Sequence, residues 1–415
     1  MNLKSIAFIQ KMFCEYYKKY YLPNSSLLMI ERREFGFSSF EGWMLRHKSF
    51  YNSDDLKKFL QVSVPSDAYC SCALYEDPEA EMDKKGWLGA DLIFDIDADH
   101  VPTCCEKLHD KWVCSVCNLT GKGFTPLSCP VCGSEKFEVK TWLCQVCLDS
   151  AKREAVKLLD VLRQDFGFSK KDISVFFSGH RGYHVHVESK AIRTIDAVTR
   201  KEIVDYVSGL GLDVRFHGLD KKRLSETSSS KSLPLGKSGW RKRLVSGMQN
   251  LIINTEEEKF REIGLKKNIA ETILKNKDII VKKWLTRGTW GAVRGIGFET
   301  WKKLAEYSVG VQSVKIDTVV TTDIHRLIRL ADTLHSKTGF KKVRFPVSAI
   351  DDFDPFKSGV AFKTGAVTVF VSDAPGFRVG DELFGPYKKQ KVELPTAAAM
   401  LLICKDRAKV LKHNV

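Results

Sequence analysis

The segment Asp91-Leu-Ile-Phe-Asp-Ile-Asp97 constrains the fold of this chain more than any other. Its four apolar residues suit a buried strand, in which residues two apart project from the same face. Asp95 and Asp97 would then aim two carboxylates at one point, an arrangement that raises their energy unless a cation lies between them. Acidic residues that hold two hard divalent ions, Mg²⁺ or Mn²⁺, commonly support phosphoryl and nucleotidyl transfer. A solvated turn at a strand end is the alternative for an Asp-x-Asp pair alone.

A second constraint comes from cysteine, because eight of the twelve cysteines lie between Cys104 and Cys147. Two Cys-x-x-Cys pairs separated by eleven residues predict a zinc ribbon with four thiolate ligands, namely Cys114, Cys117, Cys129 and Cys132. The remaining candidates predict a second structural zinc site, formed by Cys105, His109, Cys144 and Cys147. Swapped pairing between the two sites, and Cys104 in place of Cys105, remain open at this point.

The rest of the chain predicts a mixed α+β protein. An amphipathic helix is expected over 3–21, a short helix over 53–60, and a further helix that starts after an N-cap at Ser150. Strands are expected over 173–177, 183–187 and 313–320. The tail should mix strands and turns and then form a helix over 395–412.

We divide the chain into a catalytic core with insertions. The predicted ranges are 1–100, 148–215 and 310–345 for the core, 101–147 for a zinc-binding insertion, 216–309 for a basic loop plus a mostly helical subdomain, and 346–415 for a C-terminal segment that completes the core. Between Lys221 and Arg243 basic residues predominate, which indicates an exposed loop or linker and, as a second reading, a nucleic-acid contact.

Two further motifs suit a triphosphate. Ser178-Gly-His-Arg-Gly-Tyr-His184 joins the two strands at 173–187, and its glycines allow close approach of the backbone to a ligand. The second motif begins at Asp317 and continues through Arg326-Leu-Ile-Arg329 to His335. In isolation, the first is also compatible with a plain β-turn and the second with a solvated charged face.

Taken in order, these motifs resemble the catalytic small subunit of archaeal and eukaryotic DNA primase, most closely the archaeal branch. The resemblance runs from about residue 30 to residue 340 and includes Arg33-Glu-Phe-Gly-Phe37 followed by Arg46. It implies a primase-polymerase type core sheet flanked by helices. It also implies that Asp95, Asp97 and Asp317 are the catalytic metal ligands. The implied nucleotide-binding residues are Arg46, Ser178, Arg181, His184, Arg329 and His335.

The implied function is template-directed synthesis of short primers on single-stranded DNA from NTPs or dNTPs during replication, with a large subunit as heterodimeric partner. A primase-polymerase of repair or bypass is one alternative, and a non-catalytic zinc-ribbon nucleic-acid-binding protein is another. The net charge of +15 suits a polyanionic partner, although it also suits general solubility. Without a long apolar run or a secretory signal, the chain is expected to avoid membranes and to act in the cytoplasm, or in the nucleus of a eukaryote.

Overall fold

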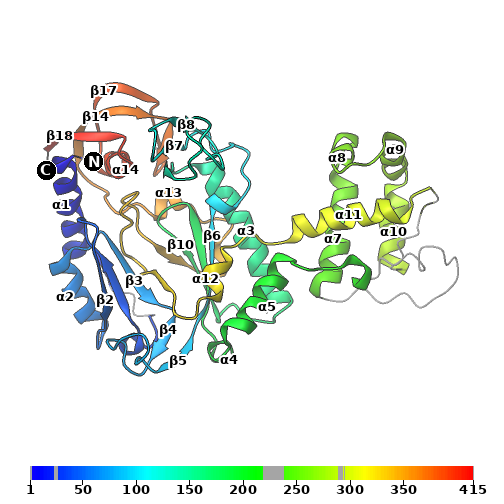
Figure 1. Ribbon diagram of the computed structural model, residues 1–415, viewed down its shortest axis with the longest axis horizontal. Coiled ribbons are helices and arrows are strands. Elements are labelled where there is room, and N and C mark those ends of the chain that lie inside the picture. The colour runs from blue at the N-terminus through cyan, green and yellow to red at the C-terminus, as the bar shows by residue number, and fades with distance from the viewer. Residues whose placement is uncertain (1, 23–26, 218–237, 288–292, 294, 415) are drawn as a thin grey trace. The chain divides into compact units, whose positions relative to one another are not determined.

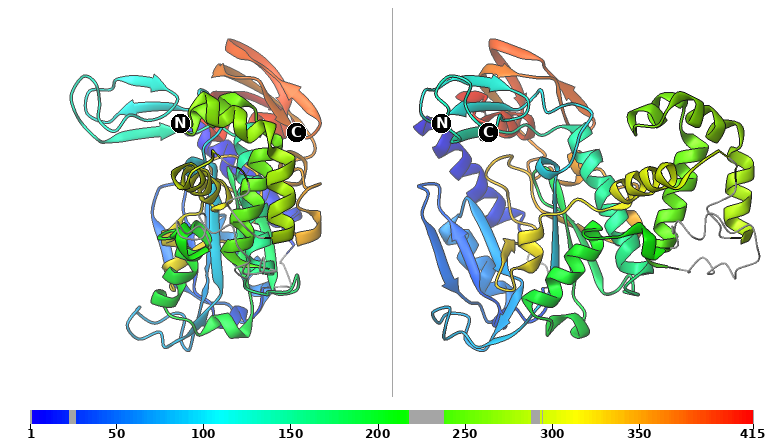
Figure 2. Two further views of the ribbon diagram at one scale, coloured as in Figure 1. Left: turned by 90° about the vertical axis from the view of Figure 1, so that its right-hand side faces the viewer. Right: turned by 45° about the vertical axis from the view of Figure 1, so that its right-hand side comes forward.

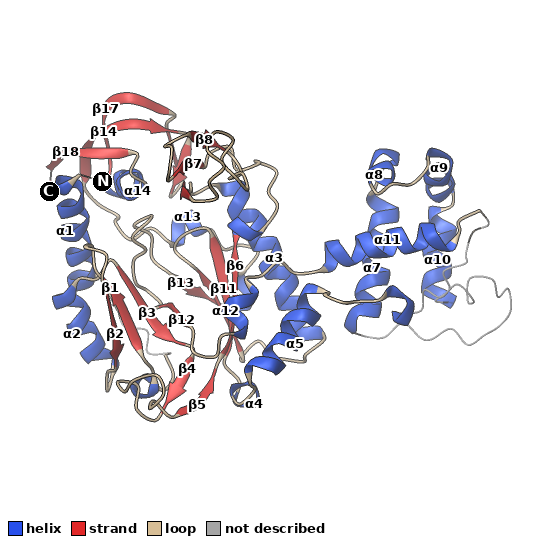
Figure 3. Cartoon of the chain, viewed as in Figure 1, coloured by secondary structure: helices blue, strands red, loops and turns tan. Residues whose placement is uncertain are grey.

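The computed structural model describes residues 2–22, 27–217, 238–287, 293 and 295–414. By internal contacts the chain forms two units. The first comprises Met1–Ala155, Lys170–Lys201 and Ile316–Val415, and the second comprises Val156–Ser169 and Glu202–Lys315. The predicted α+β class is confirmed, since helices and several separate sheets make up the first unit (Figure 3). The predicted division into core, zinc-binding insertion and helical subdomain stays a prediction.

The central sheet of the first unit has four antiparallel strands in the order β13-β10-β11-β6. Figure 1 labels β6 and β10 of this sheet, and Figure 3 labels β11 and β13. Their bounds are β6 Leu92–Asp97, β10 Ile173–Phe177, β11 Gly182–Val187 and β13 Val343–Phe345. All residues of β10 and β11 are buried. A strand that is covered on both faces needs side chains that pack on both, which explains why four of the five residues of β10 are Ile, Val or Phe.

A second antiparallel sheet has the order β12-β3-β1-β2. Its strands are β1 Phe35–Ser38, β2 Met44–Lys48, β3 Asp67–Ser71 and β12 Leu327–Arg329. Cys70 and Ile328 of this sheet line the same cavity as Ile93 and His186 of the central sheet. The inner faces of the two sheets therefore oppose each other, and the acidic strand β6 presents its carboxylates to the space between them.

The two ends of the chain meet in the first unit. Helix α1 (Leu3–Lys19) packs beside α14 (Thr396–Cys404) and β18 (Ala408–Asn414) (Figures 1 and 2). Strand β18 pairs with β14 (Ala366–Ala374), whose other neighbour is β17 (Tyr387–Pro395). The predicted helix over 395–412 is therefore wrong after Cys404. Its last part completes this sheet, because pairing with β14 satisfies the backbone of the segment.

The cysteine-rich segment folds as a small three-stranded sheet in the order β8-β7-β9. The strands are β7 Lys111–Cys114, β8 Thr120–Lys122 and β9 Phe137–Lys140. Helix α3 (Gln145–Gln164) follows at once, so the predicted N-cap at Ser150 is wrong. The Ser150 hydroxyl lies inside the helix and donates to the carbonyl oxygen of Val146 at 2.9 Å, a bond that competes with its use as a cap.

Helices predominate in the second unit, in agreement with the mostly helical character predicted within 216–309. They include α7 Gly239–Asn254, α8 Glu257–Glu262, α9 Lys267–Lys275, α10 Lys277–Arg287 and α11 Phe298–Gln312. Trp301 and its apolar neighbours on α7 and α11 form the core of this unit. Most of the predicted basic loop lies outside the described residues. Arg243, at its end, is not exposed, because α7 buries it in ion pairs with Asp160 at 2.9 Å and Asp165 at 2.6 Å.

The remaining elements connect these layers. They are α2 Ser53–Ser63, β4 Ala73–Tyr75, β5 Trp87–Ala90, α4 Lys190–Arg193, α5 Ala197–Ser208, α12 Thr318–Thr322, α13 Pro355–Ser358, β15 Phe377–Val379 and β16 Glu382–Phe384. None of the helices in the described ranges combines the length and the apolar character that crossing a membrane requires.

Candidate active site

Asp95 and Asp97 lie on one face of β6, as the alternation of the strand predicts. In the ladder with β11, Asp95 is opposite His184 and Asp97 is opposite Gly182. His184 Nε2 lies 3.5 Å from Asp95 Oδ1. At Gly182 an added Cβ would come within 2.1 Å of the Ile96 carbonyl oxygen, so only glycine allows this approach of the two strands.

Asp317 reaches the same place by a route that the sequence did not indicate. The predicted strand over 313–320 is wrong, because Asp317 is the N-cap of α12 and its side chain accepts from the backbone N–H of Val319 at 3.0 Å. The backbone N–H of Asp317 donates to the carbonyl oxygen of Asp95 at 2.9 Å. This bond joins the third predicted carboxylate to the acidic strand.

The electrostatics of Asp95 reflect this gathering of acids. Burial, together with the negative charges of Asp97 and Asp317, raises the pKa of Asp95 from 3.8 to about 7. Burial also raises the pKa of Asp97, assisted by the charge of Asp99. Within the described part of the chain, only the two cysteine-rich sets have three or more ligand atoms within 4.8 Å of one another, so the three carboxylates are spaced more loosely. Their oxygen donors and mutual repulsion suit hard divalent cations.

The turn between β10 and β11 carries the predicted nucleotide motif. The Ser178 side-chain oxygen accepts from the backbone N–H groups of His180 and Gly182, each at 3.2 Å, which leaves its hydroxyl proton available to a ligand. Gly179 has a φ of +83°, and an added Cβ would lie 3.3 Å from the Cβ of His335. Glycine is therefore required both by the backbone conformation and by the neighbouring loop.

That neighbouring loop brings Arg329 and His335 to the turn. Arg329 donates to Asp67 at 2.6 Å, and His335 Nδ1 lies 3.8 Å from the same carboxylate oxygen. The ring of His335 lies 4.9 Å from that of His180. The Thr338 hydroxyl donates to the Gly179 carbonyl oxygen at 2.6 Å and fixes the two segments together. The structure therefore brings Ser178, Arg329 and His335 into one neighbourhood.

Arg46 projects from β2, the edge strand of the second sheet. Its Nε donates at 2.9 Å to Glu34, whose side chain is completely buried, while the Arg46 side chain itself is 39% exposed. The ion pair with buried Glu34 holds the guanidinium of Arg46 in place, and the exposed part of that guanidinium can contact a ligand.

Arg181 differs from the other predicted phosphate-binding residues, because its side chain is completely buried. It donates to Asp110 at 2.7 Å and lies 3.2 Å from Asp99. Asp110 also accepts from His109 Nδ1 at 2.7 Å. The guanidinium thus lies between the first cysteine-rich set and the end of the acidic strand.

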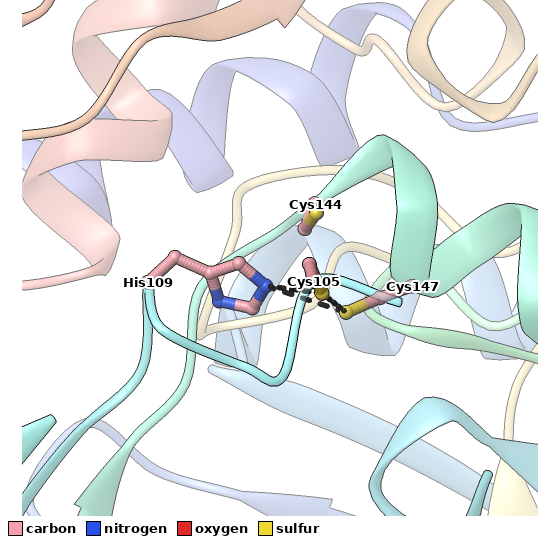
Figure 4. Close-up of side chains that lie close together, drawn as sticks. All are labelled: Cys105, His109, Cys144 and Cys147. Atoms are coloured by element: carbon pink, nitrogen blue, oxygen red, sulfur yellow. Dashed lines mark hydrogen bonds between the residues drawn. The ribbon is translucent and has the colours of Figure 1, made fainter. Parts of the chain in front are cut away.

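The first cysteine-rich set is Cys105, His109, Cys144 and Cys147, whose ligand atoms all lie within 4.8 Å of one another. His109 Nε2 is 3.4 Å from the sulfurs of both Cys105 and Cys147 (Figure 4). The second set is Cys114, Cys117, Cys129 and Cys132. Both sets offer four soft or borderline donors without an open position, which fits structural zinc. The grouping is the predicted one, and exposed Cys104 belongs to neither set.

Several polar residues that complete the site were missed at the sequence level. Asp67 and Asp110 lie outside every motif, and each holds one of the predicted arginines. Lys342 is buried between the sheets, donates to the Arg329 carbonyl oxygen at 2.7 Å, and has a pKa that burial lowers to about 7. Lys405 ends the apolar helix α14 and contacts His180. Isolated residues in ordinary contexts leave no sequence signal that would have singled them out.

Comparison with known proteins identifies the class of protein that this fold and site belong to. The profile of the family described as DNA primase small subunit matches residues 136–348. Similarity to whole relatives extends over nearly the entire chain. The chain belongs to the DNA primase small subunit family, and it is a primase of the nucleotidyltransferase type.

The relatives are archaeal proteins named DNA primase small subunit PriS. The chain is 30% identical to that of Nitrosopumilus maritimus over 99% of this chain and 100% of the relative. It is 32% identical to that of Methanococcoides burtonii, with 98% and 99% covered. For Archaeoglobus fulgidus the identity is 33%, with 97% of each chain covered. The resemblance to the archaeal branch is therefore confirmed.

Proposed function

We propose that this chain synthesises short primers on single-stranded DNA by two-metal nucleotidyl transfer from NTPs or dNTPs during DNA replication. The single observation that supports this best is the junction of β6 and α12. There the Asp317 N–H donates to the Asp95 carbonyl oxygen, and one end of the central sheet gathers three carboxylates beside a glycine-flanked turn. That combination provides cation ligands and phosphate ligands side by side.

In the proposed reaction a 3′-hydroxyl attacks the α-phosphate of the incoming nucleotide in line, and pyrophosphate leaves. Asp95, Asp97 and Asp317 would hold two Mg²⁺ or Mn²⁺ ions, which lower the pKa of the attacking hydroxyl and neutralise charge on the leaving group. His184 lies against Asp95 Oδ1 and fixes the direction of that carboxylate. Since the protein forms no covalent bond to the substrate, positioning and electrostatics supply the rate.

The phosphates of the nucleotide would be held by the residues around the turn. Ser178 has a hydroxyl proton to donate, and Arg329 brings positive charge from the opposite loop. His335 lies in the same loop, and because burial and the neighbouring cations lower its pKa well below the usual histidine value, it would contact the phosphates as a neutral ring. Arg46 would add a contact from the second sheet. Arg181 contributes positive potential from beneath the turn, and its pairing with Asp110 and Asp99 also favours a part in fixing the end of β6.

Zinc at the two cysteine-rich sets would be structural. The sheet of the insertion is small, and metal ligation commonly replaces a hydrophobic core in such a segment. We further propose a large primase subunit as the heterodimeric partner and single-stranded DNA as the template.

The test is synthesis without a primer. The purified chain, alone and with its large subunit, is given single-stranded DNA, nucleotides and Mg²⁺ or Mn²⁺. Labelled products that start without a primer support the proposal. Extension of supplied primers only would favour a primase-polymerase of repair or bypass, and DNA binding without any synthesis would favour a non-catalytic protein.

A further inference from the structure

A buried basic cluster lies where three segments of the first unit meet: the turn between β10 and β11, the loop after β12, and the end of α14. The C-cap of α14 is Lys405, whose Nζ lies 2.8 Å from His180 Nε2. The His180 ring in turn packs on that of His335. Lys405 is only 7% exposed and His180 only 8%, so the cluster is a built feature of the interior and not a surface contact.

The charges around the cluster are predominantly positive. The charges that most affect His180 are those of Lys405, Arg181, Lys337 and Arg329, all of them cationic. Burial, together with the positive charges of Arg181 and Lys337, lowers the pKa of Lys405 to about 7, against a smaller opposing effect of Asp110. The nearby carboxylates are already paired with other cations, since Asp67 pairs with Arg329 and Asp110 pairs with Arg181.

Lys405 itself has no ion-pair partner among the residues that the structure describes, and its ammonium group is directed at the His180 ring. A buried cation without a counter-charge raises the free energy of the folded protein. Binding of an anion to such a buried cluster therefore lowers the free energy of the folded protein more than binding to an exposed cluster would. The adjacent Ser178 hydroxyl and the glycine turn identify the anion that fits, because this turn leads directly into the strand opposite the carboxylates.

We propose that Lys405 and His180, together with His335, bind the phosphate tail of the incoming nucleoside triphosphate, so that the C-terminal helix α14 contributes directly to the nucleotide site. The proposal rests on the function proposed above. Deep burial favours a nucleotide tail over a DNA backbone, which is normally tracked by exposed lysines. The bound phosphate would supply the missing counter-charge, and Lys405 would turn its hydrogen bond from His180 Nε2 to a phosphate oxygen.

The variant that tests this is Lys405→Met in the full-length chain, since methionine keeps the apolar stem that α14 buries. Binding of a nucleoside triphosphate and of inorganic tripolyphosphate is measured by calorimetry in Mg²⁺-free buffer. We expect both affinities to fall by about 10- to 100-fold, the range for a hydrogen bond to a charged group. KM for nucleotide should rise by a similar factor with kcat nearly unchanged, because the contact exists before and during the reaction.

Three comparisons separate this role from a purely structural one. Lys405→Arg should restore most of the affinity, and Lys409→Met, at an exposed position on β18, should leave it unchanged. Without ligand, Lys405→Met should melt at the same temperature as wild type or higher, because it removes a buried unpaired charge. It should also lose most of the thermal shift that tripolyphosphate produces. A lowered melting temperature with a wild-type ligand shift would overturn the proposal, as would unchanged binding.

The outcome is distinguishable from failure of the proposed function. If tripolyphosphate binding depends on Lys405 but the wild-type chain makes no primers, the phosphate site stands and the function fails. If wild type makes primers and Lys405→Met binds nucleotide normally, the function stands and this site is rejected.

Discussion

Replacing Asp95 with asparagine should stabilise the metal-free protein while it abolishes synthesis. The pKa of Asp95 rises from 3.8 to about 7, mainly through burial and then through Asp97 and Asp317. This difference of about 3 units corresponds to about 4 kcal/mol at about 1.36 kcal/mol per unit, an upper limit for the free energy that ionisation of Asp95 subtracts from folding. Asparagine has nearly the same shape and no charge, so it should recover much of this amount.

The effect of Asp95 ionisation on the stability of the folded protein depends on pH. Below pH 3.8 the carboxyl is protonated in both the folded and the unfolded chain and contributes nothing. Between that pH and about 7 the unfolded chain ionises first, and the folded protein loses stability as pH rises. The advantage of Asp95→Asn should therefore be largest at pH 8 and should shrink as pH falls from 7 toward 4.

The assay is urea unfolding followed by tryptophan fluorescence in Mg²⁺-free buffer at pH 8.0 and 5.5. Asp83→Asn serves as the control, since Asp83 is exposed on a loop and its replacement should change stability at neither pH. Added Mg²⁺ should stabilise wild type more than Asp95→Asn. A variant less stable than wild type at pH 8, or a gain that does not depend on pH, would refute the argument that these carboxylates repel one another in the absence of metal.

Three further predictions concern the rest of the site. Wild type should contain two zinc ions per chain by elemental analysis. Cys105→Ser and Cys117→Ser should each lose one of these ions. Only Cys105→Ser should also abolish synthesis, because its zinc site is linked through Asp110 and Arg181 to the acidic strand. A content of one zinc in wild type would exclude the two-site arrangement. His184→Ala should lower kcat/KM for nucleotide about tenfold or more without changing template affinity in a filter-binding assay, because His184 positions the Asp95 carboxylate. A change confined to DNA binding would mean that this part of β11 contacts template. Asp67→Asn should lower both thermal stability and nucleotide affinity, since it releases the buried guanidinium of Arg329, and a wild-type melting curve would contradict the ion pair.

The sequence predicted those parts of the site whose geometry is local. Alternation along β6 was sufficient to place Asp95 and Asp97 on one face, and the Cys-x-x-Cys spacing was sufficient to group the zinc ligands. Asp317 was selected by resemblance, but its backbone was predicted as a strand because Thr318-Val-Val-Thr-Thr322 is rich in β-branched residues. Capping by Asp317 overrode that propensity.

Contacts between distant segments could not be predicted. Nothing near Lys405 in the sequence indicates that it lies against His180, 225 residues away. The same holds for Asp67 beneath Arg329, at a separation of 262 residues. These contacts depend on how the two sheets and the C-terminal helix pack against one another. The residue pattern within a short stretch of sequence does not predict that packing.

Primer-free synthesis by matched active and inactive chains is the decisive measurement of the catalytic role of Asp95. Wild type and Asp95→Asn, each with the large subunit, are incubated with single-stranded DNA, NTPs, dNTPs and Mg²⁺ or Mn²⁺, and the products are resolved on a sequencing gel. We expect short products from wild type and none from Asp95→Asn, although the variant is folded and contains its full complement of zinc. Synthesis by Asp95→Asn at the wild-type rate would contradict the proposal that Asp95 is a catalytic metal ligand.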